Sequence, residues 1–417
     1  MTSAVPLADF PLLARTGRGG SRLVYLDSAA TSQRPRAVLQ AERDFLFHSY
    51  GPVGRGSHIL AEEASTAVED ARDKVAGFVG VPSSELIWTK NATEAINIVS
   101  YGLLNAGLDG GELGLKEGDT IVVTRAEHHA NLVPWQLLAA RTGAKLAWLD
   151  VISEGPDAGR IDLDTLSVIT ERTKVVAITH VSNVTGAITP VEEIARAAKA
   201  VGALVVLDAC QSVPHFGVDL DALGVDAAAF SAHKMLGPTG IGGLWMRGEL
   251  AEKLPPVITG GSMVEIVTME NTTYAAPPAK FEPGTQPVSQ IVGFGAACDY
   301  LQAVGMETIA AHEHALTERM IRGMADVDGV RILGPTTLEN RVGAVAFDVA
   351  DVHPHDVGQV LDASGVLVRV GHHCAQPIHR VFDTFSSSRA SIGPYNTTDD
   401  VDAFLEALPR VRSYFGV

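Results

Sequence analysis

The sequence predicts an α/β fold in which a large domain with a mainly parallel, seven-stranded sheet precedes a smaller α+β domain. Short apolar runs alternate with amphipathic stretches, which is typical of strands joined by helices. The apolar runs show no alternation of polar and apolar residues, as expected for strands covered by helices on both faces. Beyond about residue 305 the pattern changes, and this change indicates the second domain.

The large domain is built from strand-like runs separated by helical stretches. Strands are expected at residues 85–89, 120–124, 145–151, 174–181, 203–208, 227–231 and 242–246. Helices are expected at residues 62–80, 92–104 and 190–202. Pro190 would open the last of these helices at a favoured first-turn position.

The smaller domain follows a proline- and glycine-rich connection at 277–287 and a long segment at 288–304. Its strands are expected at residues 330–334, 342–349 and 366–371, and its helices at 306–326, 354–364 and 398–414. We therefore expect an N-terminal segment, 1–27, that packs with the small domain, a large domain at 28–305 and a small domain at 306–417.

Composition excludes several classes of protein. The chain has 417 residues and a net charge of -17, which disfavours binding to nucleic acid and to anionic membranes. Its three cysteines make no disulfide framework, and Cys210 and Cys298 lie in apolar runs typical of a core. The N-terminus lacks the features of a signal peptide, and no apolar run is long enough to span a bilayer. A cytoplasmic, soluble protein is expected.

Two residues at strand ends indicate a cofactor. Asp208 ends one apolar strand, and Lys234 lies just beyond the next strand. Ligands of parallel α/β sheets bind at the carboxyl ends of strands, so both side chains would face one crevice. An amine that can form a Schiff base and a carboxylate that can pair with a protonated ring nitrogen suit pyridoxal phosphate. A structural ion pair or a solvated lysine is the alternative for either residue alone.

A phosphate-binding corner is expected beside them. Ser231 and His233 flank Lys234 and offer a hydroxyl and an imidazole. Ala92 and Thr93 begin an amphipathic helix, whose free N–H groups and dipole favour an anion. A capped helix that binds nothing is the alternative for this feature by itself.

With these residues in place, the chain resembles a SUF-type (SufS-like) cysteine desulfurase, a class V member of the fold-type I pyridoxal-phosphate enzymes. The matching motifs, in chain order, are YLDSAATSQRP (25–35), RGSH (55–58), TKNATEAIN (89–97), AEHHANLVPWQ (126–136), HVSNVTG (180–186), LDACQS (207–212), SAHKMLGPTGIG (231–242), FEPGT (281–285), RVGHHCAQP (369–377) and SRASIGPYNT (388–397). They cover nearly the whole chain. One departure is Gly54, which stands where the family usually has histidine before Arg55.

The resemblance implies a role for each matching residue. Lys234 would be the Schiff-base lysine and Asp208 the partner of the ring nitrogen. His128 would stack on the ring and relay protons, and Gln211 would approach the ring hydroxyl. The remaining roles are cofactor or substrate contact for Asn183, phosphate binding for Ala92, Thr93, Ser231 and His233, phosphate binding in the other subunit of a homodimer for Thr285, and binding of the substrate carboxylate for Arg389 and Arg369.

Cys374 lies in a short polar loop, where a thiol is reactive. In the family this cysteine takes the sulfur of L-cysteine as a persulfide, and L-alanine leaves. Only the thiolate is nucleophilic, and the neighbouring His372 and His373 could lower the thiol's pKa or accept its proton. An inert thiol is one alternative. A zinc site is another, but four ligands at suitable spacing are usual and no second cluster stands beside this one. No bound metal is therefore expected.

The sulfur then needs an acceptor for iron–sulfur cluster assembly. Two acceptor types serve the family, a SufE-like protein with its own cysteine and a SufU-like zinc scaffold. The stretch HPHDVGQVLDASG (353–365) resembles the branch served by the zinc scaffold, with His355 as the residue that engages the zinc. A simple helix start is the alternative for His353 and His355. Other class V lyases, such as a selenocysteine lyase, and a non-catalytic assembly subunit are competing functions, and the latter should have lost Lys234 or Asp208.

Overall fold

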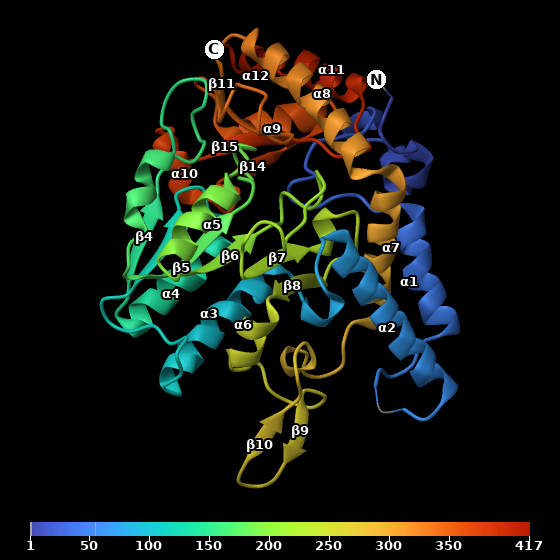
Figure 1. Ribbon diagram of the computed structural model, residues 1–417. Coiled ribbons are helices and arrows are strands. Elements are labelled where there is room, and N and C mark those ends of the chain that lie inside the picture. Colours follow the sequence, from blue (N-terminus) through green and yellow to red (C-terminus); the bar gives the residue numbers. More distant parts are fainter. Residues whose placement is uncertain (1, 55) are drawn as a thin grey trace.

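A seven-stranded mixed sheet lies at the centre of the computed structural model, which describes residues 2–54 and 56–417 (Figure 1). The strand order is β2-β8-β7-β6-β5-β3-β4. The strands are β2 (Leu86–Thr89), β3 (Thr120–Thr124), β4 (Lys145–Leu149), β5 (Thr173–Thr179), β6 (Leu204–Asp208), β7 (Ala227–Ser231) and β8 (Gly242–Met246). Only β8 runs antiparallel to its neighbours, so the predicted mainly parallel sheet is confirmed.

Helices cover both faces of this sheet, which explains its uniformly apolar strands. One face packs against α2, α5 and α7, and the other packs against α3, α4 and α6. The helices of this part are α1 (Arg36–His48), α2 (Ile59–Phe78), α3 (Ala92–Leu108), α4 (Val133–Thr142), α5 (Val191–Ala200), α6 (Gly248–Lys253) and α7 (Val288–Val304). Helix α5 begins at Val191, so Pro190 is its N-cap and not a first-turn residue as predicted.

The C-terminal part forms a second layer around a four-stranded antiparallel sheet of order β11-β12-β15-β14. Its elements are α8 (Met306–Ala325), β11 (Val330–Leu333), β12 (Ala344–Val349), α9 (Pro354–Ala363), β13 (Val366–Leu367), β14 (Arg369–Gly371), α10 (Gln376–Val381), β15 (Ser387–Ser391), α11 (Thr398–Ala407) and α12 (Pro409–Phe415). Two predictions were wrong here. The expected strand at 366–371 is split between two sheets, and the expected helix at 398–414 breaks before Pro409.

The N-terminal segment lies against the C-terminal part. Strand β1 (Val24–Tyr25) pairs with β13, and the amide of Ala4 donates to the carbonyl of Pro394 at 3.0 Å. Arg22 forms an ion pair of 2.6 Å with Asp400. These contacts join the N-terminal segment to the C-terminal part, and the expected division into domains stays a prediction.

A hairpin of β9 (Val264–Val267) and β10 (Thr272–Tyr274) projects away from the body of the molecule (Figure 1). It precedes the expected connection at 277–287, which contains a short 3-10 turn at Ala279–Phe281. The sequence did not indicate this hairpin. Across the part of the chain that the structure describes, no helix is both long and apolar enough to cross a membrane.

Candidate active site

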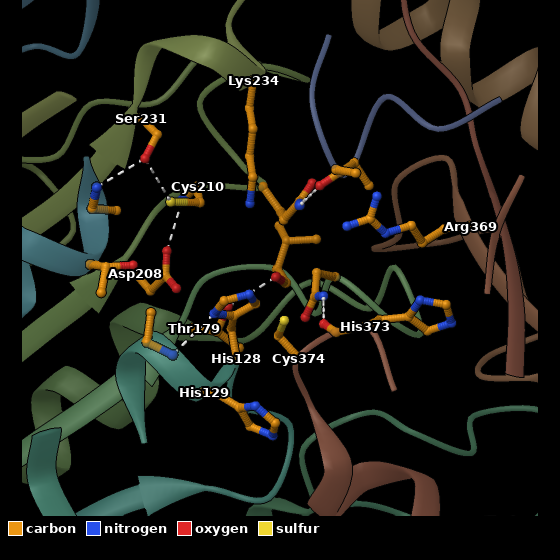
Figure 2. A pocket seen from close by; sticks show the side chains of 18 of the residues that line it. His128, His129, Thr179, Asp208, Cys210, Ser231, Lys234, Arg369, His373 and Cys374 are labelled. Atoms are coloured by element: carbon orange, nitrogen blue, oxygen red, sulfur yellow. Dashed lines mark hydrogen bonds between the residues drawn. The ribbon is translucent and has the colours of Figure 1, made fainter. Parts of the chain in front are cut away.

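The carboxyl ends of three adjacent strands supply the floor of the site. Asp208 ends β6 and lies opposite Thr179, the last residue of β5. The carboxylate of Asp208 accepts a hydrogen bond from the Cys210 amide at 3.0 Å. Lys234 ends the short 3-10 turn that follows β7 (Ala232–Lys234), so its side chain extends into the same space from the neighbouring strand (Figure 2). The predicted pairing of an acid and an amine from neighbouring strands is therefore present.

The N-terminus of α3 forms one wall of this space. Asn91 caps the helix by accepting from the Glu94 amide at 2.9 Å, and the Ala92 amide donates to the Ser231 hydroxyl at 2.9 Å. Gly242 allows this approach, because a Cβ there would lie 2.9 Å from the Cα of Asn91. The hydroxyl of Ser231 and the first turn of α3 thus lie together, as an anion site requires.

His233 and His128 are both neutral at physiological pH. Burial, followed by the charge of Lys234, lowers the pKa of each ring to about 4. The Nδ1 of His128 accepts from the Ala130 amide at 3.0 Å, so its proton is assigned to Nε2. The ring of His233 lies 3.2 Å from the hydroxyl of Thr31. Each ring can therefore donate one hydrogen bond without carrying a charge.

Glu127, the residue before His128, fixes the loop that follows β3. Its carboxyl is fully buried and accepts from the Thr124 hydroxyl at 2.7 Å, the Thr179 amide at 2.9 Å and the Asn131 amide group at 2.7 Å. Burial raises the pKa of Glu127 to about 8. These three bonds join the loop of His128 to the end of β5, and the sequence analysis did not single out this residue.

Two amide side chains place polar atoms beside the strand ends. Gln211 donates to the carbonyl of Ala29 at 2.7 Å, while its own buried Oε1 has no partner. Asn183 donates to the carbonyl of His373 at 2.7 Å and so contacts the loop of Cys374. Buried polar atoms are rarely left without a partner, so the Oε1 of Gln211 indicates a position for a ligand.

Arg389 and Arg369 lie opposite one another on β15 and β14. Asp27 is 3.4 Å from the former and 3.5 Å from the latter, and it balances part of their charge. Arg389 is buried, and this burial lowers its pKa to about 10. Its Nε has no partner. A buried guanidinium with an unused donor suits a carboxylate, as predicted for this residue.

Cys374 is carried by a strained turn. Both His373 and Cys374 have positive φ, 50° and 54°, which side chains other than glycine rarely adopt. The thiol is free and exposed. The backbone amide of His129 donates to the carbonyl of Cys374 at 2.6 Å, and the ring of His129 accepts from the Gln376 amide at 3.1 Å.

One histidine next to Cys374, His373, belongs to a hydrogen-bonded group with His379 and Ser387. The Nε2 of His373 and the Nε2 of His379 each lie 2.9 Å from the hydroxyl of Ser387. The Nδ1 of His379 donates to the carbonyl of Ala375 at 2.9 Å, so Ser387 donates to His379 and accepts from His373. Burial holds the pKa of His373 well below its usual value. A neutral His373 therefore carries no positive charge and keeps a lone pair on Nδ1, which is buried and has no partner.

One cavity of about 570 Å³ joins these residues. Figure 2 shows Lys234, Asp208, His128 and Cys374 around it. The predicted residues that line it are Ala92, Thr93, His128, Asn183, Asp208, Gln211, Ser231, His233, Lys234, Arg369, Cys374 and Arg389. Cys210 also lines it, so it is not only the core residue that was expected.

Thr285 and His355 lie elsewhere. Thr285 lines a separate hollow of about 590 Å³ together with Gly54 and Arg72. His355 lies at the start of α9 with 62% of its side chain exposed. Arg55, part of a predicted motif, lies outside the described residues. Within the described part of the chain, neither Thr285 nor His355 lines the cavity that holds Cys374.

Besides Glu127, two residues that hold the site together were not predicted from the sequence. Asp27 sits in the quoted motif at 25–35, but only the fold brings it between two arginines. His129 follows the predicted His128, and the doubled histidine was the only signal for it.

The residues present fit pyridoxal phosphate. An amine and a carboxylate come from neighbouring strand ends, an anion site lies at the start of α3, and the Oε1 of Gln211 has no protein partner. This fold and this set of groups define the class of fold-type I pyridoxal-phosphate enzymes.

Comparison with known proteins narrows this class. The family model described as Aminotransferase class-V matches residues 24–404. The chain is 55% identical to "Probable cysteine desulfurase 2" of Mycobacterium leprae, with 98% of this chain and 96% of that protein covered. It is 51% identical to "Probable cysteine desulfurase" of Streptomyces coelicolor, at 98% and 96% coverage. The apo structure of cysteine desulfurase from Thermococcus onnurineus superposes with a TM-score of 0.89 at 35% identity, covering 99% of this chain and 100% of that one.

The chain therefore belongs to the class V aminotransferase family and, within it, to the cysteine desulfurases. The predicted fold, the pyridoxal-phosphate cofactor and the predicted enzyme class are confirmed.

Proposed function

We propose that this enzyme converts L-cysteine to L-alanine and transfers the sulfur to Cys374 as a persulfide. The observation that supports this proposal most is that the thiol of Cys374 shares one cavity with Lys234, Asp208 and Arg389. An enzyme that only eliminated a group from its substrate would not need a thiol there.

The substrate is oriented by its carboxylate in this proposal. Arg389 is buried and has a free Nε, so a carboxylate bound to it would face little competition from water. Arg369 is half exposed and lies 3.5 Å from Asp27, and in this proposal it would also contact the substrate carboxylate. The side chain of the bound cysteine would then extend toward Cys374.

The cofactor would be held by groups already described. Lys234 would form the covalent link, Asp208 would pair with the ring nitrogen, and Gln211 would approach the ring hydroxyl. Thr93, Ser231, His233 and the amide groups at the start of α3 would hold the phosphate. When bound, pyridoxal phosphate supplies an electron sink that loosens bonds at the α-carbon of an amino acid.

Sulfur transfer balances without an added oxidant or reductant. The Cys374 thiolate forms an S–S bond with the substrate sulfur while the substrate Cβ–S bond breaks. The electron pair of that bond stays with the carbon fragment, which takes up protons and leaves as alanine. In this proposal the Nε2–H of His128 would donate a proton to the carbon fragment, and a histidine next to Cys374 would accept the proton of the thiol.

The experiment is a single-turnover incubation of the purified enzyme with L-cysteine. We expect one equivalent of alanine per site and a mass increase of one sulfur atom on the peptide that contains Cys374. In Cys374→Ala the cofactor should still bind, because the thiol acts later, and alanine formation should fall at least about 100-fold. Cys298→Ala, which removes a buried thiol outside the cavity, is the control. Unchanged alanine formation in Cys374→Ala would favour another class V lyase, such as a selenocysteine lyase.

The sulfur acceptor is the finer part of the proposal. We propose a SUF-type role in iron–sulfur cluster assembly, with a SufU-like zinc scaffold as the acceptor and a SufE-like protein as the alternative. The exposed ring of His355 supports the zinc scaffold, since a neutral imidazole is a good zinc ligand. A cytoplasmic location is proposed with it.

A homodimer with shared sites completes the proposal. Thr285 lines a hollow that is separate from the cavity of its own chain. Apolar side chains are exposed on the projecting β9–β10 hairpin, including Ile266 and Val267. Exposed apolar groups on a projecting element are typical of an interface. The partner's cavity would receive Thr285 across this interface.

A further inference from the structure

The loop of Cys374 is held from the large domain by two contacts of a single residue. The backbone amide of His129 donates to the carbonyl of Cys374 at 2.6 Å. The Nε2 of the same residue accepts from the amide of Gln376 at 3.1 Å. Both bonds hold the backbone directly after the Cα that carries the thiol, at the carbonyl of Cys374 and at the amide of Gln376.

This turn needs external support, because its own backbone is strained. Two successive residues, His373 and Cys374, have positive φ, and each such residue costs about 1 kcal/mol or more unless its surroundings fix it. Further support comes from the bond between Asn183 and the carbonyl of His373 at 2.7 Å. Asn183 thus holds the turn just before Cys374, and His129 holds it at Cys374 itself and two residues further on.

The turn that carries His129 is also fixed. His129 begins a short 3-10 turn, His129–Asn131, directly after His128. The side chain of Asn131 is buried and bonded to Glu127 and to Trp135, so this turn has little freedom. A fixed turn on one side and a strained loop on the other make His129 the link between them.

We propose that His129 is a positioning residue for sulfur transfer, which sets the place of the Cys374 thiol relative to His128 and the cavity. This inference rests on the proposed function. The Nε2 of His129 must be unprotonated to accept from the amide of Gln376. Burial, followed by the charge of His372, lowers the pKa of His129 and so favours the neutral ring. A displacement of about 1 Å of a reacting group can lower the rate about 100-fold, so loss of this contact should slow sulfur transfer.

Two substitutions separate the ring's acceptor from the rest of the residue. His129→Phe keeps a ring and the backbone bond but removes the acceptor. His129→Gln replaces the ring by an amide whose oxygen has a similar reach and can accept from Gln376. His314→Phe, at an exposed position on α8, controls for the change of residue type.

The first readout does not depend on activity. Hydrogen exchange of the peptide 371–377, followed by mass spectrometry in the cofactor-free protein, should be about tenfold faster in His129→Phe than in the wild type. The Gln variant and the His314→Phe control should exchange at about the wild-type rate. Unchanged exchange in His129→Phe would overturn the proposed contact, whatever the reaction of the enzyme.

The second readout is kinetic. With cofactor bound, His129→Phe should lower kcat for alanine formation about 10- to 100-fold with little change in KM, and His129→Gln should restore most of it. Equal losses in both variants would overturn the positioning role, as would an unchanged kcat beside faster exchange. If the wild type formed no alanine, the proposed function would fail, and the exchange result would still decide on the contact.

Discussion

Six histidines in or near the cavity share one property, a lowered pKa. Burial is the largest cause in each, because a protonated ring loses its hydration. The affected rings are His128, His129, His180, His233, His373 and His379. Neutral rings can accept or donate single protons, which is what positioning and proton relay require. The same property makes folding sensitive to acid.

His180 allows this sensitivity to be measured away from the reacting groups. The ring is buried against Phe216, its Nδ1 has no partner, and burial lowers its pKa to about 4. In the unfolded chain the pKa would be about 6.5. Below pH 6.5 the unfolded chain therefore binds a proton that the folded protein does not. The contribution of His180 to stability is complete above pH 6.5 and is lost as the pH falls toward 4, by about 1.4 kcal/mol per pH unit.

We expect the free energy of unfolding of His180→Asn to fall less steeply with acid than that of the wild type. Denaturant unfolding of the cofactor-free protein at pH 7.5, 6.0 and 5.0 gives the two slopes. The difference should approach one proton between pH 6.0 and 5.0. His314→Asn, at an exposed position, should keep the wild-type slope. Identical slopes in His180→Asn and the wild type would contradict the lowered pKa.

Individual residues were predictable where their place followed from a strand end or a motif. Asp208 and Lys234 could be located because parallel strands bring their carboxyl ends to one edge. The ion pairs of Asp27 with two arginines could not, because Asp27 and Arg389 are 362 positions apart and only the packing of the N-terminal segment brings them together. The hydrogen bond of His373 to Ser387, 14 positions away in sequence, was likewise a result of packing.

Among the elements, α9 contains His355, the residue proposed to contact the sulfur acceptor. Its first turn begins at Pro354, and the ring of His353 caps it by accepting from the His355 amide at 3.2 Å. The ring of His355 is left at the surface, 3.9 Å from Asp356. This leaves an imidazole free to bind a metal that a partner protein presents.

His355→Ala should leave the basal rate of alanine formation nearly unchanged, because the residue does not line the cavity. Stimulation by a zinc-loaded SufU-type protein should be lost, since the ligand that displaces the scaffold's cysteine is gone. His353→Asn is the matched control, because asparagine keeps the N-cap of α9. Activity assays with and without the scaffold measure both effects. Full stimulation of His355→Ala would remove this residue from sulfur transfer.

Elements with a strong internal signal were predicted well, and short ones were not. The main-sheet strands and the long helices carry uniform or periodic apolar patterns, and all seven strands were found. Strands β13 and β14 are only two and three residues long, and their separation depends on β1, which pairs with the former. The β9–β10 hairpin is largely exposed, so it has no core-facing pattern from which it could be inferred.

At the scale of the whole molecule, the proposed homodimer predicts that Thr285 acts in the cavity of the other chain. The residue is exposed, and it follows a glycine with positive φ, Gly284, in the loop before α7. Its hollow shares no described lining residue with the cavity of Cys374. If Thr285 binds the phosphate of the other subunit, its loss must act across the interface. A mixed dimer can distinguish this effect across the interface from an effect within one chain.

The test uses mixed dimers of two defective chains. Thr285→Val removes a hydroxyl donor to a charged group and should weaken cofactor binding about tenfold, or about 1.4 kcal/mol. Lys234→Ala abolishes turnover in its own cavity. In a dimer of one chain of each kind, the cavity with Lys234 receives an intact Thr285 from the other chain. That single cavity should bind cofactor with wild-type affinity and give about half the wild-type activity, and sedimentation equilibrium should confirm the dimer. If Thr285 acted within its own chain, the mixed dimer would keep the weakened affinity, and a monomer in solution would exclude the shared site altogether.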